Sequence, residues 1–189
     1  AVATLDGLMA RAERWDDLAR LLEGSATRSR RSVSATLSRL GDVHRTKLDQ
    51  AAVAVDWYSR AIGVDPTDQA AREGLNDLLT VESAAALAPA IAETLAQAYG
   101  ATHDWRLTLD LLEPRIEGAG NERSQTAVLK EAAKLHLNRG QNPSGAFDCV
   151  ARALSLAADD LVLESHLMRL AEVTGRWADA AQALEAGAR

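Results

Sequence analysis

The side chains best suited to bind zinc or to act as a strong nucleophile are those of Cys149 and of the histidines His44, His103, His136 and His166. A zinc site needs several Cys, His or carboxylate ligands at short spacing, and no such group recurs around these histidines. A cysteine nucleophile needs a neighbouring base and a lowered pKa, whereas Cys149 stands at an interior-type helix position. The sequence also lacks a glycine-rich phosphate loop and a Gly-x-Ser-x-Gly turn. We therefore predict a protein that is not an enzyme and that uses no metal and no cofactor.

The remaining charged residues group in ways that helices explain. Carboxylate pairs at residues 16–17 and 159–160 come just before apolar helical patterns, where they complement the helix dipole. Six Lys or Arg residues between positions 28 and 47 face a single acid, Asp42, which fits a solvated helix face better than a patch for an anionic partner. Lys130, Lys134 and Asn138 are spaced four apart, so they share one face of a helix. That face is a candidate for gripping a ligand.

Composition predicts which elements position these residues. The chain has 189 residues, a formal net charge of −6, and only 4% aromatic residues. Pro is scarce and Ala is abundant, which favours closely packed helices and an all-α fold. The negative charge argues against nucleic acid as a partner. No apolar run is long enough to insert into a membrane, and one cysteine cannot form an internal disulfide. These features predict a cytoplasmic protein. The chain does not begin with methionine, which indicates a fragment and leaves an upstream targeting signal open.

Apolar residues recur at helical spacing along nearly the whole chain and predict about eleven helices. We expect one domain, residues 1–189, with its weakest joint near 118–122, where Gly118, Gly120 and Asn121 cluster. Asp65 and Pro66 predict a cap and a first helical residue. Region 83–100 holds one helix or two, because Pro89 would interrupt a helix that began at residue 83. Further helices are expected at roughly 2–13, from Trp15, at 29–46, after Asp49, from Asp104, at 122–139, after the cap and proline pair Asn142 and Pro143, after Asp160 and from Trp177.

Internal repetition is the strongest pattern. The segment AVDWYSRAIGVDPTD matches AFDCVARALSLAADD 92 positions later, pairing Ala54 with Ala146 and Ala61 with Ala153. A second motif occurs three times as RWDDLARLLE, DWRLTLDLLE and RWADAAQALE, each with a Trp near its start. Repeated helix pairs of this kind bury their apolar faces by stacking on one another.

These residues resemble the tetratricopeptide-repeat (TPR) family, whose unit is a helix hairpin of about 34 residues. Gly41, Ala54, Tyr58, Ala61 and Pro66 stand at the family's pattern positions. The second copy departs from the pattern, with Ala133 in place of Gly41, Val150 in place of Tyr58 and Ala158 in place of Pro66. The Trp-led segments look like those of large bacterial repeat scaffolds. The resemblance implies an α-solenoid of stacked antiparallel hairpins.

The resemblance also implies a binding surface. In the family, first-helix residues line the concave face, and a clamp of Lys, Arg and Asn there grips a peptide carboxylate. Placed on this chain, that face carries two stripes: Ser38, Asp42 and Arg45, and Lys130, Lys134 and Asn138. We expect a non-catalytic scaffold for a protein or peptide partner. An alternative is a structural spacer, or a segment that forms homo-oligomers through the solenoid ends, within a larger bacterial assembly.

Overall fold

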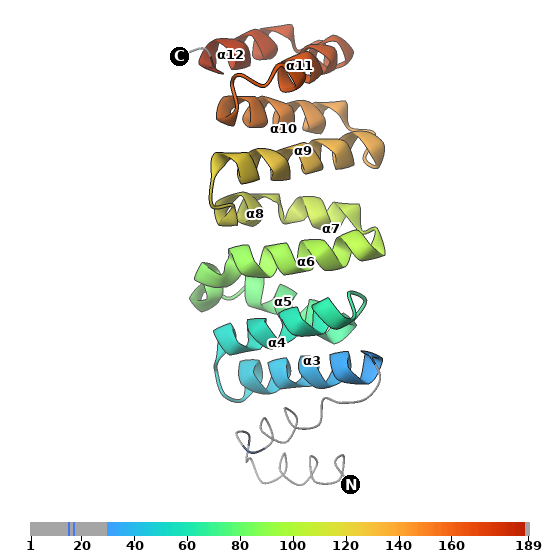
Figure 1. Cartoon of the computed structure of the whole chain (residues 1–189), viewed down its shortest axis with the longest axis vertical. Coiled ribbons are helices and arrows are strands. Elements are labelled where there is room, and N and C mark those ends of the chain that lie inside the picture. Colours follow the sequence, from blue (N-terminus) through green and yellow to red (C-terminus); the bar gives the residue numbers. More distant parts are fainter. Residues whose placement is uncertain (1–14, 16, 18–29, 188–189) are drawn as a thin grey trace. The chain divides into compact units, whose positions relative to one another are not determined.

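The computed structural model describes residues 15, 17 and 30–187, and the regular structure of these residues is entirely helical. The predicted all-α class is confirmed. Contacts divide the chain into two compact units, residues 1–103 and 104–189, called unit 1 and unit 2 below and coloured along the chain in Figure 1. This division lies at residue 103 and not at the joint expected near 118–122. The expectation of a single domain remains a prediction.

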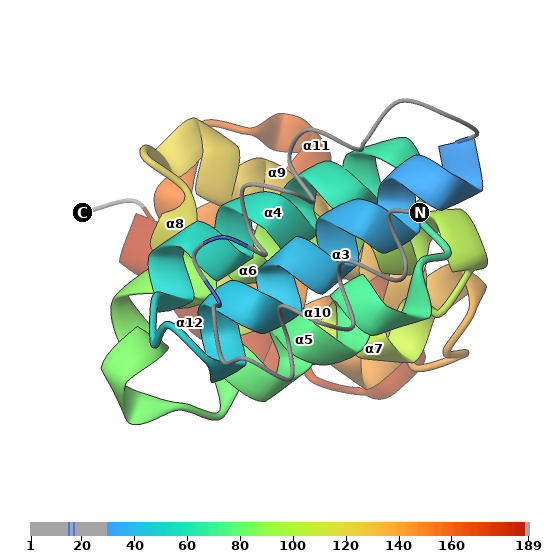
Figure 2. The same cartoon turned by 90° about the horizontal axis from the view of Figure 1, so that it is seen from below.

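Unit 1 is built on a helix hairpin with further helices stacked against it. Its described elements are α3 (Arg30–Thr46), α4 (Ala51–Val64), α5 (Gln69–Leu79), the 3-10 helix η1 (Glu82–Leu87) and α6 (Ala88–Thr102). Helix α3 packs against both α4 and α5, as Figure 2 shows, and α4 and α5 pack in turn against η1 and α6. The helix predicted at about 29–46 and the one predicted after Asp49 are confirmed over the described residues.

Small residues determine how closely the helices of unit 1 approach one another. Ala54 and Ala61 are fully buried on α4, and Tyr58 lies buried between them. A Cβ atom on Gly41 would lie 2.6 Å from Cδ1 of Tyr58, and one on Gly74 would lie 2.6 Å from its hydroxyl oxygen. The tyrosine ring thus fits only because glycine faces it from both α3 and α5.

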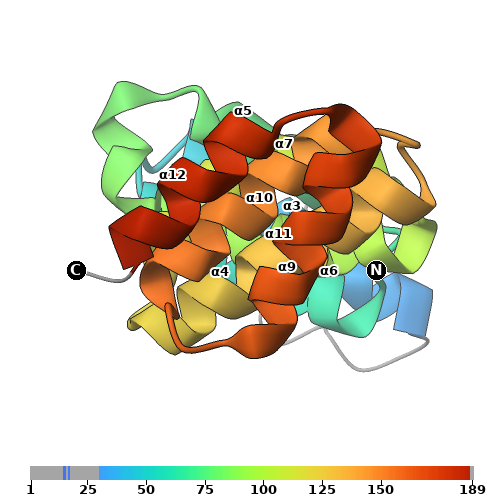
Figure 3. The same ribbon diagram turned by 90° about the horizontal axis from the view of Figure 1, so that it is seen from above.

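Unit 2 contains a matching hairpin with different side chains. Its elements are α7 (Trp105–Asp110), α8 (Leu112–Gly118), α9 (Glu122–Asn138), α10 (Pro143–Leu156), α11 (Leu161–Thr174) and α12 (Trp177–Gly187). Helices α9 and α10 form a hairpin, and α11 and α12 both pack on α10, as the view in Figure 3 shows. Ala146 and Ala153, the partners of Ala54 and Ala61 in the repeat, are fully buried in the core of this unit. Each unit is a short α-solenoid built on such a hairpin.

Three helix starts test the capping predictions. Asn142 caps α10 by accepting a hydrogen bond from the Gly145 backbone N–H, with Pro143 at the first position, as predicted. Asp160 caps α11 in the same way, by accepting from two backbone N–H groups. The prediction for Asp65 is wrong. Its carboxylate accepts from the backbone N–H of Thr67 at 2.9 Å in a local turn, and α5 starts three residues later behind the cap Asp68.

Prolines explain the two irregular regions between the repeats. Region 83–100 contains two helices, because η1 ends at Leu87 and α6 begins with Pro89 in its first turn, where the missing N–H costs nothing. The helix expected from residue 104 is broken at Leu111, since Pro114 cannot donate to the carbonyl of Asp110. If α7 and α8 count as one broken helix, an even number of helices lies between the two copies of the repeat, α3–α4 and α9–α10. Helix α9 therefore opens its hairpin just as α3 does.

The helices expected at 2–13 and from Trp15 lie almost entirely outside the described residues. Within the described part, no single helix is long and apolar enough to cross a membrane, although α5 together with η1 and α6 passes that test as a pair bent by 115°. The expected helices from 122, 143, 161 and 177 are all present.

Candidate functional site

The first predicted stripe is engaged in contacts within unit 1. Ser38 is only 1% exposed, and its hydroxyl has no hydrogen-bond partner within the described residues. The reason is the packing of α3 on α5: Ser34, one turn before Ser38, donates to the capping carboxylate Asp68 of α5. Ser38 lies on the same buried face of α3. The prediction of a surface contact for Ser38 is wrong.

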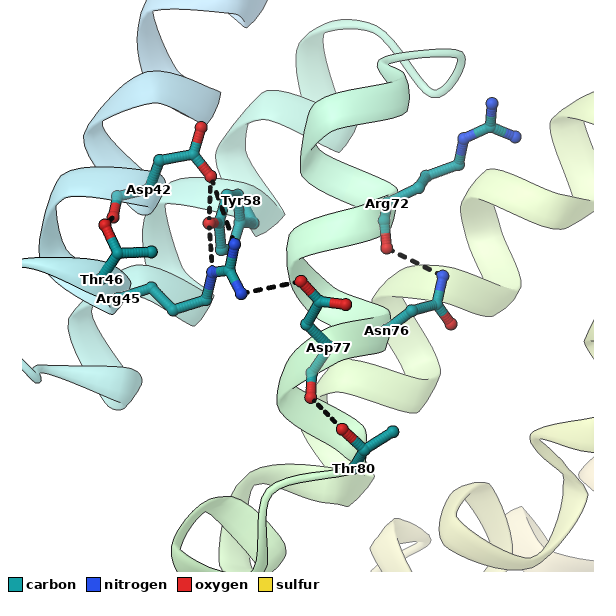
Figure 4. A network of polar contacts seen from close by, with 8 residues as sticks. All are labelled: Asp42, Arg45, Thr46, Tyr58, Arg72, Asn76, Asp77 and Thr80. Carbon is teal, nitrogen blue, oxygen red and sulfur yellow. Dashed lines mark hydrogen bonds and ion pairs between the residues drawn. The ribbon is translucent and has the colours of Figure 1, made fainter.

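Asp42 and Arg45 are held in a network inside unit 1 (Figure 4). The Tyr58 hydroxyl donates to Oδ1 of Asp42 at 2.7 Å, and Nε of Arg45 donates to the same hydroxyl at 3.2 Å. Arg45 also forms an ion pair with Asp77 of α5 at 2.8 Å. Burial of the ring, with the Asp42 hydrogen bond, raises the pKa of Tyr58 far above its ordinary value. These residues join α3, α4 and α5, and their polar groups are already satisfied.

The second predicted stripe borders an open groove in unit 2. The groove has a volume of about 420 Å³ and lies between α9 and α11, with α10 as its floor. Its lining is mostly apolar, and the side chains include Ala133, Leu137, Pro143, Val150, Val162, Leu163, Leu170 and Val173. Lys130, Lys134, His166 and Arg169 complete it. We call this surface the groove.

Polar groups at the groove fall into a paired and an unpaired set. Lys130 donates to Oδ2 of Asp160 at 2.6 Å, and this bond lowers the pKa of the carboxyl below its ordinary value. Lys134, His166 and Arg169 are exposed, and none of them makes a hydrogen bond or ion pair within the part of the chain that the structure describes. Lys134 and Arg169 therefore bring unpaired positive charge to the lining of the groove. Asn138 is also exposed but does not line the groove.

Sequence reasoning missed the α11 side of the groove. Val162, His166, Arg169 and Val173 are spaced by four, three and four residues, which places them on one face of α11. Val162 is 60% and Val173 67% exposed, although both are large apolar residues. An apolar stripe at helical spacing normally faces a core. The two basic residues inside the stripe were the available sign that it faces a ligand.

Most of the other candidate residues are buried or packed against neighbouring side chains. His44 is buried, donates from Nδ1 to the amide oxygen of Gln50 at 2.9 Å, and stacks on Trp57. Cys149 is buried and free, and burial raises the pKa of its thiol. The described residues contain no cluster of His, Cys, Asp or Glu that could hold a metal ion. Trp105 packs beside Gly140, whereas Trp177 is half exposed.

Comparisons with known proteins add little detail. No protein-family model matches the chain, and neither does any curated protein. The crystal structure of a protein described as a kinesin light chain of Podosopora anserina, with nearly identical TPR-like repeats, is similar over 98% of this chain and 92% of its own. The two share 17% sequence identity with a TM-score of 0.36. The description of the fold as an α-solenoid rests on the helix hairpins and their small-residue contacts.

Proposed function

We propose that this chain is a non-catalytic scaffold that binds a peptide segment of a partner protein in the groove. The observation that carries the proposal is an apolar surface exposed between α9 and α11 with unpaired positive charge beside it. Exposed apolar surface of this kind on a folded unit is characteristic of a binding site. The first helices of the hairpins line it, as the family resemblance implies for a ligand.

Burial of the groove residues supplies the driving force. Leu137 is 43% exposed, and Val162 and Val173 are more exposed still. Each square ångström of apolar surface that a partner covers contributes about 25 cal/mol before the costs of association. Lys134 and Arg169 then favour a partner with carboxylates, because a charge-assisted hydrogen bond is stronger than a neutral one. An acidic segment, or a peptide with a free C-terminal carboxylate, satisfies both requirements.

The class of partner follows from charge. A chain with a net charge of −6 repels a polyphosphate backbone overall, so the basic residues at the groove favour a protein ligand over nucleic acid. The buried lone thiol of Cys149 is compatible with a reducing compartment, and we propose a cytoplasmic location for the scaffold. Of the six residues of the two predicted stripes, we retain Lys130 and Lys134 as groove residues.

A library of displayed peptides, half with free C-termini, tests this proposal on the full chain. We expect acidic peptides to be enriched and their affinity to fall in the Lys134→Ala, Arg169→Ala variant. Arg139→Ala is the matched control, since Arg139 is exposed on the same unit but does not line the groove. Binding that is equally strong in all three proteins would exclude the groove as the site.

A second candidate is self-association as a spacer or assembly segment. The last two helices expose Leu161, which is 76% accessible, and Trp177, which is 50% accessible, neither of which lines the groove. Sedimentation analysis of the chain over a concentration range distinguishes the two candidates. Oligomers that dissociate in the Leu161→Ser, Trp177→Ser variant favour the spacer role in a larger assembly, and a monomer throughout favours the peptide-binding scaffold.

A further inference from the structure

We propose, building on the function proposed above, that the groove receives an aromatic side chain of the partner flanked by carboxylates, in the place that Tyr58 fills in unit 1. The repeat itself indicates this occupant. Unit 1 shows how the same position looks when the chain supplies the ring, and unit 2 shows it with the ring missing.

Residues 92 positions apart occupy the same place in the two units. The residues around the ring in unit 1 are Tyr58, Gly41, Asp42, Arg45, Gly74 and Asp77. In unit 2 the same places hold Val150, Ala133, Lys134, Leu137, His166 and Arg169. All six of these unit 2 residues line the groove. The groove is therefore bordered by the residues that correspond to the ring and its network, with Ala133 and His166 in place of the two glycines, and a ring would enter the space left open between α9 and α11.

The helices pack differently in the two units, as the replacement of tyrosine by valine requires. In unit 1, α3 packs directly on α5, with Tyr58 between Gly41 and Gly74 and the Arg45–Asp77 ion pair beside it (Figure 4). In unit 2, α9 and α11 both pack on α10 and not on each other. Valine is much smaller than tyrosine, and no other side chain among the described residues of unit 2 closes the space. The groove is thus open because Val150 stands in the place of Tyr58 and different residues surround it.

Charge specifies what the occupant must carry. In unit 1 two carboxylates, Asp42 and Asp77, surround one guanidinium, Arg45. In unit 2 both carboxylate places hold a cation, Lys134 and Arg169. Of the other ionisable residues that line the groove, Lys130 is paired with Asp160 and His166 is exposed, and α10 contributes none. A partner that fits has to bring the carboxylates that unit 2 lacks.

Size and surface fit an aromatic ring. A volume of about 420 Å³ lies within the range of ligand pockets, about 300–1,000 Å³, so one ring with its neighbouring backbone can enter. The floor offers Val150 and Leu170, and aromatic rings contribute more buried area per side chain than aliphatic ones. A guanidinium such as that of Arg169 also binds favourably over the face of a ring.

Fluorescence anisotropy with three labelled peptide amides tests the inference on the full chain. The parent probe is Gly-Ser-Asp-Asp-Tyr-Asp-Ser-Gly; one control replaces its Tyr by Ala, and the other replaces its three Asp by Lys. We expect the parent to bind at least about tenfold more tightly than either control. Lys134→Asp with Arg169→Asp, which installs the unit 1 residues, should weaken the parent at least about tenfold, while Arg139→Asp, outside the groove, leaves it unchanged.

Each outcome separates this inference from the proposed function. Equal affinity for the Tyr and Ala peptides, still lost in the Lys134→Asp, Arg169→Asp variant, overturns the aromatic occupant and leaves an acidic-peptide groove. No binding by any peptide, or binding that the groove variant does not change, overturns both. If the unliganded chain self-associates and the groove variant abolishes this, the occupant is a second copy and the inference is wrong. Circular dichroism of each variant confirms that it is folded.

Discussion

Replacing Gly41 by alanine would place a methyl group against the ring of Tyr58. The new Cβ atom would lie 2.6 Å from Cδ1 of that ring, well inside van der Waals contact. The ring cannot retreat, because on its other side Gly74 approaches equally closely and its hydroxyl is held by Asp42. Either α3 moves away from α4 or Tyr58 leaves its position, and both responses break contacts that join α3, α4 and α5.

The size of the effect follows from two opposing contributions. Overpacking a close helix contact costs about 1–3 kcal/mol. Alanine is a better helix former than glycine by up to about 1 kcal/mol, which offsets part of that cost. We therefore expect Gly41→Ala to lower the free energy of unfolding by about 1–2 kcal/mol. A methyl group on Gly63 of α4 would meet no atom within 4 Å, so Gly63→Ala gives the propensity gain alone, about 0.4–1 kcal/mol.

Urea unfolding followed by circular dichroism measures both variants, and hydrogen exchange of α4 amides reports on unit 1 by itself. The sharper test adds Tyr58→Val, which together with Gly41→Ala copies the Ala133 and Val150 pair of unit 2. With the ring gone, Gly41→Ala should cost nothing, so the cycle yields a coupling of about 1–3 kcal/mol. If Gly41→Ala, with Tyr58 present, lowers the free energy of unfolding no more than Gly63→Ala does, the close packing of the ring between Gly41 and Gly74 is refuted.

Three further predictions concern buried groups. The pKa of Tyr58 is raised in the folded state, whereas an exposed tyrosine ionises near pH 10. The Tyr58 hydroxyl therefore contributes its full stabilisation below that pH, and this contribution declines as the pH rises further. The melting temperature of Tyr58→Phe should fall less steeply at alkaline pH than that of the unchanged chain, and identical alkaline profiles would contradict this prediction. Ala153→Leu should cost about 1–3 kcal/mol in urea unfolding because Ala153 is fully buried, whereas exposed Ala158 should tolerate leucine within about 0.5 kcal/mol; similar losses at both sites would refute the hairpin contact. Cys149 is 4% exposed, so iodoacetamide should label it only as fast as unit 2 opens; labelling at the rate of a free thiol would show that it is accessible.

The helices could be predicted because their apolar spacing is strong and local. Hairpins α3–α4 and α9–α10 follow from the repeat and from small residues at close contacts. The cap of α5 could not be predicted reliably, because two aspartates three residues apart, Asp65 and Asp68, were both suitable. The structure assigns them different tasks: Asp65 closes a turn with Thr67, and Asp68 starts the helix.

The candidate site could be predicted only in part, because it depends on contacts between helices that are distant in sequence. Family analogy treated the two stripes as equivalent. The sequence already showed Val150 in the place of Tyr58. Whether this replacement leaves an opening depends on whether α5 packs on α3 and α11 packs on α9, which are contacts between helices. Where the ring is present, Asp42 and Arg45 are engaged in internal contacts. Where it is absent, Lys134 remains available at an open surface.

Methyl chemical shifts on adding a peptide test the central claim, that the groove is the binding surface, most directly. The probe is the tightest acidic peptide from the displayed library, added to the full chain with labelled Leu and Val methyl groups. We expect the groove methyls of Leu137, Val150 and Val173 to shift, and those of Val53 and Val81, exposed valines of unit 1, to stay. Shifts confined to unit 1, or a saturating peptide that moves no groove methyl, would contradict the account.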